Sequence, residues 1–183
     1  MSTVCILYGF GEGKHVSKRF QRALKQRGHG LVDNPSDAQV IITHSGGCLL
    51  LPDKISAKQI IHIAPYYWPD KTWVSCMSRK LIDDLRTHHK GGELRFWARK
   101  TFWNVLYSWN MSKNFRMLGN IRNKARWQRG DITIVARPKF DTFCTPDPKA
   151  MPFEHAPAFV SMPGHHDDCW RDPKPYLLLV KNW

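Results

Sequence analysis

The sequence predicts an α/β protein, a three-layer α/β/α sandwich in which helices cover both faces of a mostly parallel central sheet. Three observations carry this prediction. Short, β-branched, apolar segments alternate with helical segments along the chain. Several of these segments contain runs of consecutive apolar residues without polar alternation, as strands do when a sheet is buried on both faces. The length of 183 residues, 42% of them apolar, suits one folded domain with a substantial core.

Five segments are expected to form strands. Each is four to eight residues of mainly apolar or β-branched side chains, and turn-forming residues flank them. They are residues 3–8 (TVCILY), 39–44 (QVIITH), 59–65 (QIIHIAP), 131–136 (DITIVA) and 158–162 (AFVSM).

Helical segments are expected between and after these strands. Residues 15–28 carry apolar side chains at intervals of four and end in a glycine, which is typical of an amphipathic helix and its C-terminal stop. A shorter helix is expected from Cys48 to near Pro52. A last helix is expected after Pro173.

Residues 71–130 interrupt the alternation. They hold 14 Lys and Arg against 3 Asp and Glu, so most of the net charge of +13 lies there, together with five of the eight tryptophans. Residues 94–109 place apolar side chains along one helical face. Basic residues interleaved with aromatic rings occur on solvated helical faces and also at nucleic-acid or anionic surfaces. We expect a single domain over residues 1–183, with 71–130 as a basic, aromatic-rich helical cap.

The cysteines and the apolar runs bear on the compartment. Five cysteines are scattered without a C-x-x-C pair, which suits reduced thiols better than a disulfide framework or a zinc site. We find neither a leader-like apolar segment near the N-terminus nor an apolar run long enough for a membrane span. The prediction is a soluble, cytoplasmic protein.

The junction THSGG, residues 43–47, follows a predicted strand, and an apolar run resumes immediately after it. A sharp turn from strand to helix would lift the Ser45 hydroxyl above the carboxyl end of the sheet. It would also leave the Gly46 N–H unpaired at the start of the helix. A nucleophilic serine needs such an exposed oxygen and a nearby donor for the oxyanion. Ser45 is therefore a candidate nucleophile, and an ordinary turn is the alternative.

The loop YGFGEG after the first strand can approach this turn and supply a second oxyanion donor, of which the Phe10 N–H is the best candidate. A glycine-rich turn without a role is the alternative. A nucleotide site is disfavoured, because the phosphate-binding pattern G-x-x-x-x-G-K-[ST] would need glycine in place of Tyr8 and Ser or Thr in place of His15.

Two further loops follow predicted strands. Asp141 comes after residues 131–136, where a carboxylate can accept the Nδ1 proton of a histidine; Asp147 in the same loop is a competitor. His165 or His166, in PGHHDD after the last strand, could act as a base on Ser45. The alternative for this loop is a metal cluster.

The ligands of such a cluster would be His165, His166, Asp167, Asp168 and Cys169. Adjacent residues rarely point at one ion, and no histidine pair at i and i+4 accompanies them, so we expect no metal here.

These four segments resemble the motifs of the α/β-hydrolase superfamily, in the chain order nucleophile, acid, histidine. YGFG resembles its H-G-x-G oxyanion loop, THSGG its G-x-S-x-G elbow, KFDTFCTP its acid loop and PGHHD its G-x-H loop. Thr43 stands at the first glycine of the elbow and needs room for its methyl group. The resemblance spans the chain except residues 71–130, where such proteins commonly carry a variable cap.

The resemblance implies a minimal α/β-hydrolase fold with a helical lid insert. It implies Ser45 as nucleophile, His166 as general base, Asp141 as orienting acid, and the N–H groups of Gly46 and Phe10 as the oxyanion hole. The G-x-H spacing favours His166, and His165 remains the alternative. No cofactor is expected.

The expected function is a serine hydrolase that cleaves a carboxylester or thioester through an acyl-enzyme intermediate. The basic, aromatic insert favours a small-molecule substrate that is anionic or carries an acyl or aromatic group. The alternative is a non-catalytic module that binds nucleic acid or another polyanion through residues 71–130. A further alternative is that residues 93–109 rest on an anionic membrane surface.

Overall fold

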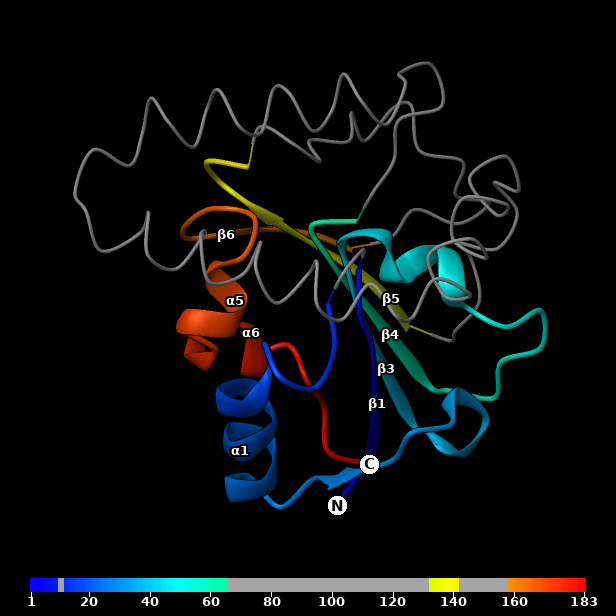
Figure 1. Ribbon diagram of the computed structural model, residues 1–183. Helices are drawn as coiled ribbons and strands as arrows, with labels where there is room; N and C mark the ends of the chain where they lie inside the picture. Colours follow the sequence, from blue (N-terminus) through cyan, green and yellow to red (C-terminus); the bar gives the residue numbers. More distant parts are fainter. Residues whose placement is uncertain (10–11, 66–131, 142–157) are drawn as a thin grey trace.

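The structure is a computed structural model, which describes residues 1–9, 12–65, 132–141 and 158–183. Its centre is a six-stranded sheet in which every pairing is parallel, with the order β2-β1-β3-β4-β5-β6 (Figure 1). The strands are β1 (Thr3–Leu7), β2 (Gly30–Leu31), β3 (Val40–His44), β4 (Gln59–Ile63), β5 (Ile132–Pro138) and β6 (Ala158–Met162).

Short helices connect or follow the described strands. The α-helices are α1 (Lys18–Gln26), α5 (Asp168–Arg171) and α6 (Lys174–Leu177), and the 3-10 helices are η1 (Pro35–Asp37) and η2 (Ser45–Leu50). In Figure 1, α1, α5 and α6 lie together on one side of the sheet, and η2 follows directly from the end of β3. The chain termini meet at the end of the sheet that lies away from η2, where the Met1 ammonium donates to the Trp183 carbonyl oxygen at 3.1 Å.

Two apolar clusters bury the faces of the sheet. The larger joins the strands to α1, α5 and α6, and it includes Val4, Phe20, Leu24, Val40, Ile42, Ile61, Ala136, Trp170 and Tyr176. The smaller packs the segment after η2 onto the other face, and it includes Cys5, Ala38, Ile41, Leu51 and Ala57. Both β3 and β4 are buried at every residue, so their apolar residues follow one another without a polar alternation.

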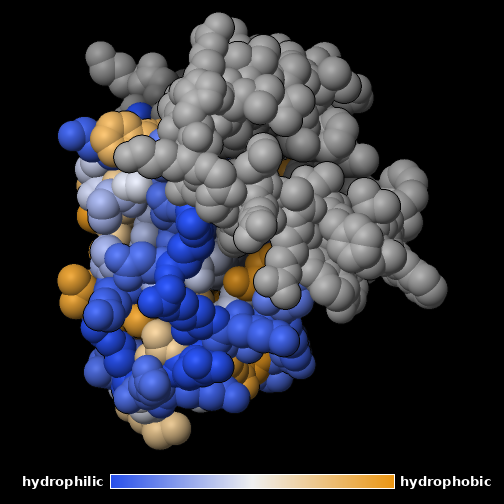
Figure 2. Space-filling model, turned by 60° about the vertical axis from the view of Figure 1, so that its left-hand side comes forward, coloured by the Kyte–Doolittle hydropathy of each residue, from blue (hydrophilic) through white to orange (hydrophobic). Residues whose placement is uncertain are grey.

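The helix α1 is amphipathic, with one buried and one exposed face. The helix buries Phe20 and Leu24 and turns its Lys and Arg side chains outward. The described residues of this face are mostly hydrophilic, with apolar residues only in small separate patches (Figure 2). No helix among the described residues is long and apolar enough to cross a membrane.

The predicted fold class is confirmed: the protein is an α/β protein with a parallel central sheet. All five predicted strands are present, and residues 158–162 agree at both ends. The cap predicted over 71–130 lies outside the described residues, as does the apolar helix expected within it.

Several local predictions were wrong. The helix expected from Cys48 is a 3-10 helix that starts three residues earlier, at Ser45, because the chain turns directly at the end of β3. The short strand β2 was not predicted, since two residues carry no periodicity. The loop PGHHDD predicted after residues 158–162 ends in the first residue of α5, Asp168, and the single turn of α5 is too short to show a helical pattern.

Candidate active site at the carboxyl edge of the sheet

Ser45 lies at the sharp turn from β3 into η2. Its φ angle is +50°, in the left-handed region that residues with a side chain avoid at a cost of about 1–2 kcal/mol. The residue is buried, like Gly46 and Gly47 after it. Such strain at a strand-to-helix turn is the backbone conformation of a nucleophile elbow.

The elbow depends on a close approach between Gly47 and the end of β1. A Cβ atom at Gly47 would lie 2.1 Å from the Leu7 carbonyl oxygen, so only glycine fits there. Thr43, where the resemblance would place a glycine, is fully buried in β3. Its hydroxyl lies 2.8 Å from His62 Nδ1 of the neighbouring strand, so the sheet accommodates the side chain through a hydrogen bond.

The loop after β1 packs against this elbow. A Cβ atom at Gly9 would lie 2.9 Å from the Ser45 Cβ and 3.1 Å from the His44 carbonyl oxygen. The Gly9 N–H donates to the Glu12 carboxylate at 3.0 Å, which holds the loop closed. Phe10, predicted as an oxyanion donor, lies outside the described residues.

His166 and Asp141 form a buried pair beyond the ends of β5 and β6. Nδ1 of His166 lies 2.9 Å from Asp141 Oδ2, and both side chains are almost fully buried. The Phe140 N–H donates to the Gly164 carbonyl oxygen at 3.1 Å, so backbone also joins the two loops. A carboxylate beside Nδ1 keeps the proton on that nitrogen and leaves Nε2 available as a base.

The other candidates for acid and base are placed differently. The ring of His165 packs against exposed Phe140, with the ring centroids 5.5 Å apart. Its backbone N–H donates to Asp168 at 2.8 Å. Asp147, the competitor of Asp141, lies outside the described residues.

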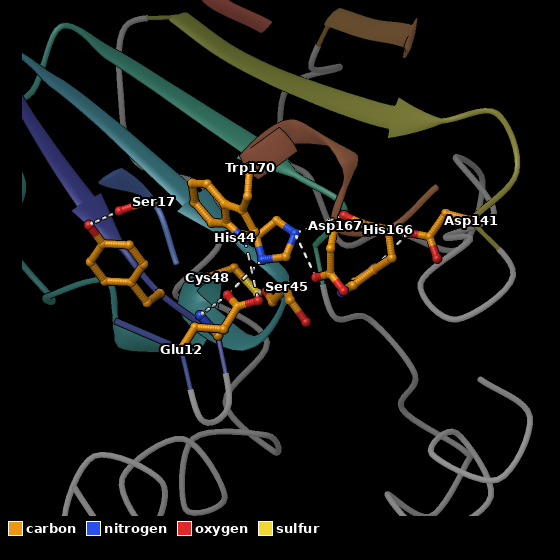
Figure 3. Close-up of polar contacts among 11 residues, drawn as sticks. Glu12, Ser17, His44, Ser45, Cys48, Asp141, His166, Asp167 and Trp170 are labelled. Atoms are coloured by element: carbon orange, nitrogen blue, oxygen red, sulfur yellow. Dashed lines mark hydrogen bonds and ion pairs between the residues drawn. The ribbon is translucent and has the colours of Figure 1, made fainter. Parts of the chain in front are cut away.

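A second buried pair, which sequence reasoning missed, lies directly beneath the elbow. His44 Nδ1 is 2.8 Å from Glu12 Oε2, with the side chains 0% and 3% exposed (Figure 3). His44 Nε2 lies 2.9 Å from the backbone carbonyl oxygen of His166. Trp170 Nε1–H donates to the other Glu12 oxygen at 3.4 Å. The signals were present in the sequence: a histidine ends an otherwise apolar strand, and a glutamate interrupts a glycine-rich loop.

His44 links the two pairs. Its ring centroid lies 4.9 Å from that of His166 and 4.8 Å from that of Trp170. Because Ser45 is the next residue, the nucleophile candidate and the His166–Asp141 pair belong to one region at the carboxyl edge of the sheet (Figure 3).

Within the described part of the chain, one group has the donor types of a metal site. Nitrogen and oxygen atoms of His44, His166 and Asp167 lie within 4.8 Å of one another. Both ring nitrogens of His44 already face hydrogen-bond acceptors, and His166 Nδ1 faces Asp141. A cation there would have to break these bonds, so the group is better described as a hydrogen-bond network.

Comparison with known proteins supports the fold. No protein-family model matches the chain, and no curated protein matches it. A deformylase of N-formylmaleamic acid from Pseudomonas putida S16 superposes with a TM-score of 0.59 at 10% identity, over 98% of this chain and 92% of its own. A monoacylglycerol lipase from Paleococcus ferrophilus gives 0.54 at 12% identity, over 97% and 92%.

An esterase from Thermogutta terrifontis gives a TM-score of 0.51 at 13% identity, over 97% of this chain and 87% of its own. Identities this low establish architecture rather than activity. The superpositions with these hydrolases cover nearly the whole chain, including its parallel sheet. The chain has the α/β-hydrolase fold.

Proposed function

We propose that this protein is a serine hydrolase that cleaves a carboxylester or thioester bond, with Ser45 as nucleophile, His166 as general base and Asp141 as orienting acid. The observation that carries the proposal is the buried His166–Asp141 pair, at 2.9 Å, on the same sheet edge as the strained Ser45. Backbone strain at a serine and burial of a polar histidine–aspartate pair both cost folding free energy, and backbone strain is concentrated at functional sites.

The proposed reaction follows from these positions. Nε2 of His166 takes the Ser45 hydroxyl proton as Oγ attacks the substrate carbonyl carbon. The Gly46 N–H, with that of Phe10, donates to the oxyanion. His166 returns the proton to the leaving alcohol or thiol, and an acyl-enzyme remains. Water then repeats the sequence with the same base and releases the acid. Asp141 keeps the Nδ1 proton in place and stabilises the imidazolium.

The structural neighbours support the class of chemistry. They include an N-formylmaleamic acid deformylase, a monoacylglycerol lipase and an esterase. We propose a small-molecule ester-like substrate for this chain. Its net charge of +13 favours anionic substrates, because the surrounding potential raises their local concentration.

The test combines hydrolysis of short p-nitrophenyl esters with labelling by a fluorophosphonate probe. Wild type should be labelled at Ser45, and Ser45→Ala should lose both labelling and turnover. Equal labelling of the two proteins would refute the assignment. His166→Ala should abolish turnover, whereas His165→Ala should retain most of it; the reverse result would assign the base to His165.

The same net charge supports the alternative, a non-catalytic module that binds nucleic acid or another polyanion. Retention on heparin that weakens steeply with salt, combined with no probe labelling, would favour this alternative. Labelling at Ser45 favours the hydrolase whatever the heparin result.

A further inference from the structure

The pair Glu12–His44 is not needed by the proposed reaction, yet its two ionisable side chains lie almost fully buried beside Ser45, 0% and 3% exposed for His44 and Glu12. Both partners lie in the interior, where charged groups persist only if they are paired and hydrogen-bonded. Glu12 accepts from the Gly9 N–H and from Trp170 Nε1–H in addition to facing His44. Both oxygens of the Glu12 carboxylate therefore receive hydrogen bonds.

The partners of His44 define its protonation. Nε2 faces the His166 carbonyl oxygen, which only accepts, so Nε2 carries a proton. Nδ1 faces Glu12, and a carboxylate that accepts two other N–H bonds is favoured in its ionised form. Nδ1 therefore also carries a proton, and His44 is an imidazolium.

The charged groups around His44 are consistent with this assignment. Burial, the largest influence, lowers the pKa of His44, but the charge of Glu12 and the hydrogen bonds of Glu12 and Cys169 outweigh it, so the pKa of His44 lies well above 6.5. The pKa of the Cys169 thiol is itself raised, mainly by burial, so Cys169 is uncharged at neutral pH and the carboxylate that faces Nδ1 is that of Glu12. Asp167 Oδ1 lies 3.8 Å from Nε2, and the imidazole of His166 lies tilted at 56° to the His44 ring.

The hydrogen bonds of this pair connect three separate segments. Glu12 holds the loop after β1 through the Gly9 N–H. His44 is the residue before Ser45, at the end of β3. Its Nε2 holds the backbone of His166, the residue proposed as the base.

We propose that Glu12 and His44 are positioning residues, whose ion pair holds the histidine loop and the loop after β1 in fixed places around Ser45. This inference rests on the proposed function. Because the Glu12 carboxylate keeps the remaining proton on Nδ1, loss of the other His44 proton would leave Nε2 bare, facing the His166 carbonyl oxygen. The bond that fixes the base would then break, so turnover falls at alkaline pH in addition to the acid limb set by His166.

The experiment compares wild type, Glu12→Gln and His44→Gln in kcat and KM from pH 5 to pH 10. A matched control is His29→Gln, since His29 is also buried but lies beyond α1, outside this network. Glu12→Gln should move the alkaline limb down by at least about one pH unit. Its kcat at pH 8 should fall about 100-fold, the cost of a misplaced base, with KM nearly unchanged. In Glu12→Asp the alkaline limb should lie between those of wild type and Glu12→Gln. The control His29→Gln should have the pH profile of wild type.

An NMR titration of the histidine side chains provides a readout independent of turnover. Wild type should show His44 titrating well above pH 6.5, Glu12→Gln should titrate lower, and the His166 signals should move with His44. An unchanged pH profile of kcat in Glu12→Gln, or a His44 that titrates near pH 6.5 in wild type, overturns the inference. If wild type is not labelled at Ser45, the proposed function fails. The movement of the His166 signals with His44 still decides whether the pair holds the histidine loop. If His44→Gln does not fold, Glu12→Gln and the titration decide.

Discussion

Substitution of Gly47 by alanine tests the close approach on which the elbow depends. The new Cβ would lie 2.1 Å from the Leu7 carbonyl oxygen and 2.7 Å from its carbonyl carbon. Ordinary contacts of such atoms need about 3.4 Å or more, so β3, η2 or the end of β1 must shift by roughly 1 Å. The strands β1 and β3 are held by the parallel ladder between them, and η2 follows directly from β3. Overpacking against backbone that cannot rotate away should cost at least about 3 kcal/mol.

Urea unfolding and thermal melting measure this cost. For a chain of this size, about 3 kcal/mol corresponds to a decrease in Tm of roughly 6–12 °C. Gly30→Ala is the matched control: its Cβ would meet only the Thr3 Cγ2, at 3.9 Å, and its backbone has no positive φ. It should change the free energy of unfolding by less than about 0.5 kcal/mol. If Gly47→Ala is as stable as Gly30→Ala, the inference that Gly47 packs closely against the end of β1 is wrong.

Three further predictions follow from the buried groups. Asp141→Asn should fold normally but lower kcat by about 10⁴-fold in ester hydrolysis, because an amide no longer selects the Nδ1 proton of His166; a loss under tenfold would contradict the role of Asp141. Since the pKa of His44 is raised on folding, its ion pair with Glu12 contributes its full stability below about pH 6.5 and loses it as the pH rises through the raised pKa. Urea unfolding should therefore show the stability gap between wild type and Glu12→Gln shrinking at alkaline pH, and a gap that widens would contradict the pairing. Burial raises the pKa of the Cys5 thiol from 9.0 to about 11, which lowers its thiolate fraction about 100-fold. Alkylation at pH 8, followed by mass spectrometry, should label Cys5 readily only in urea, and rapid labelling of the native protein would show that β1 is not buried.

The parallel sheet was predictable from sequence because its signal is local. A segment such as VIITH in β3 is apolar on both faces, and that pattern records burial whatever the chain does elsewhere. In a parallel sheet, the residues that follow successive strands meet at one edge, so Ser45, Asp141 and the histidine loop could be expected there together. The order of these residues along the chain added the resemblance to α/β-hydrolases.

The start of η2 was predicted less well. The sequence signal was an apolar run beginning at Cys48, but helical turning begins at Ser45. Backbone strain at Ser45, with a φ angle of +50°, is maintained by the packing of Gly47 on β1 and Gly9 on Ser45. Both contacts join Ser45 or Gly47 to residues far away in the sequence, so the local conformational preferences of THSGG could not have indicated the strain at Ser45.

The sequence by itself determined the strands, the sheet edge and the small set of polar residues that could act there. Tertiary structure decided which of two adjacent histidines turns toward Asp141. The two histidines are neighbours in the same loop, so only packing distinguishes them. It also decided the pairing of Glu12 with His44 and of His44 with the backbone of His166, contacts between residues 32 and 122 positions apart. The physical reason is the same in both cases. A charged group is stable in the interior only beside its partner, and that partner is supplied by the fold rather than by neighbouring sequence.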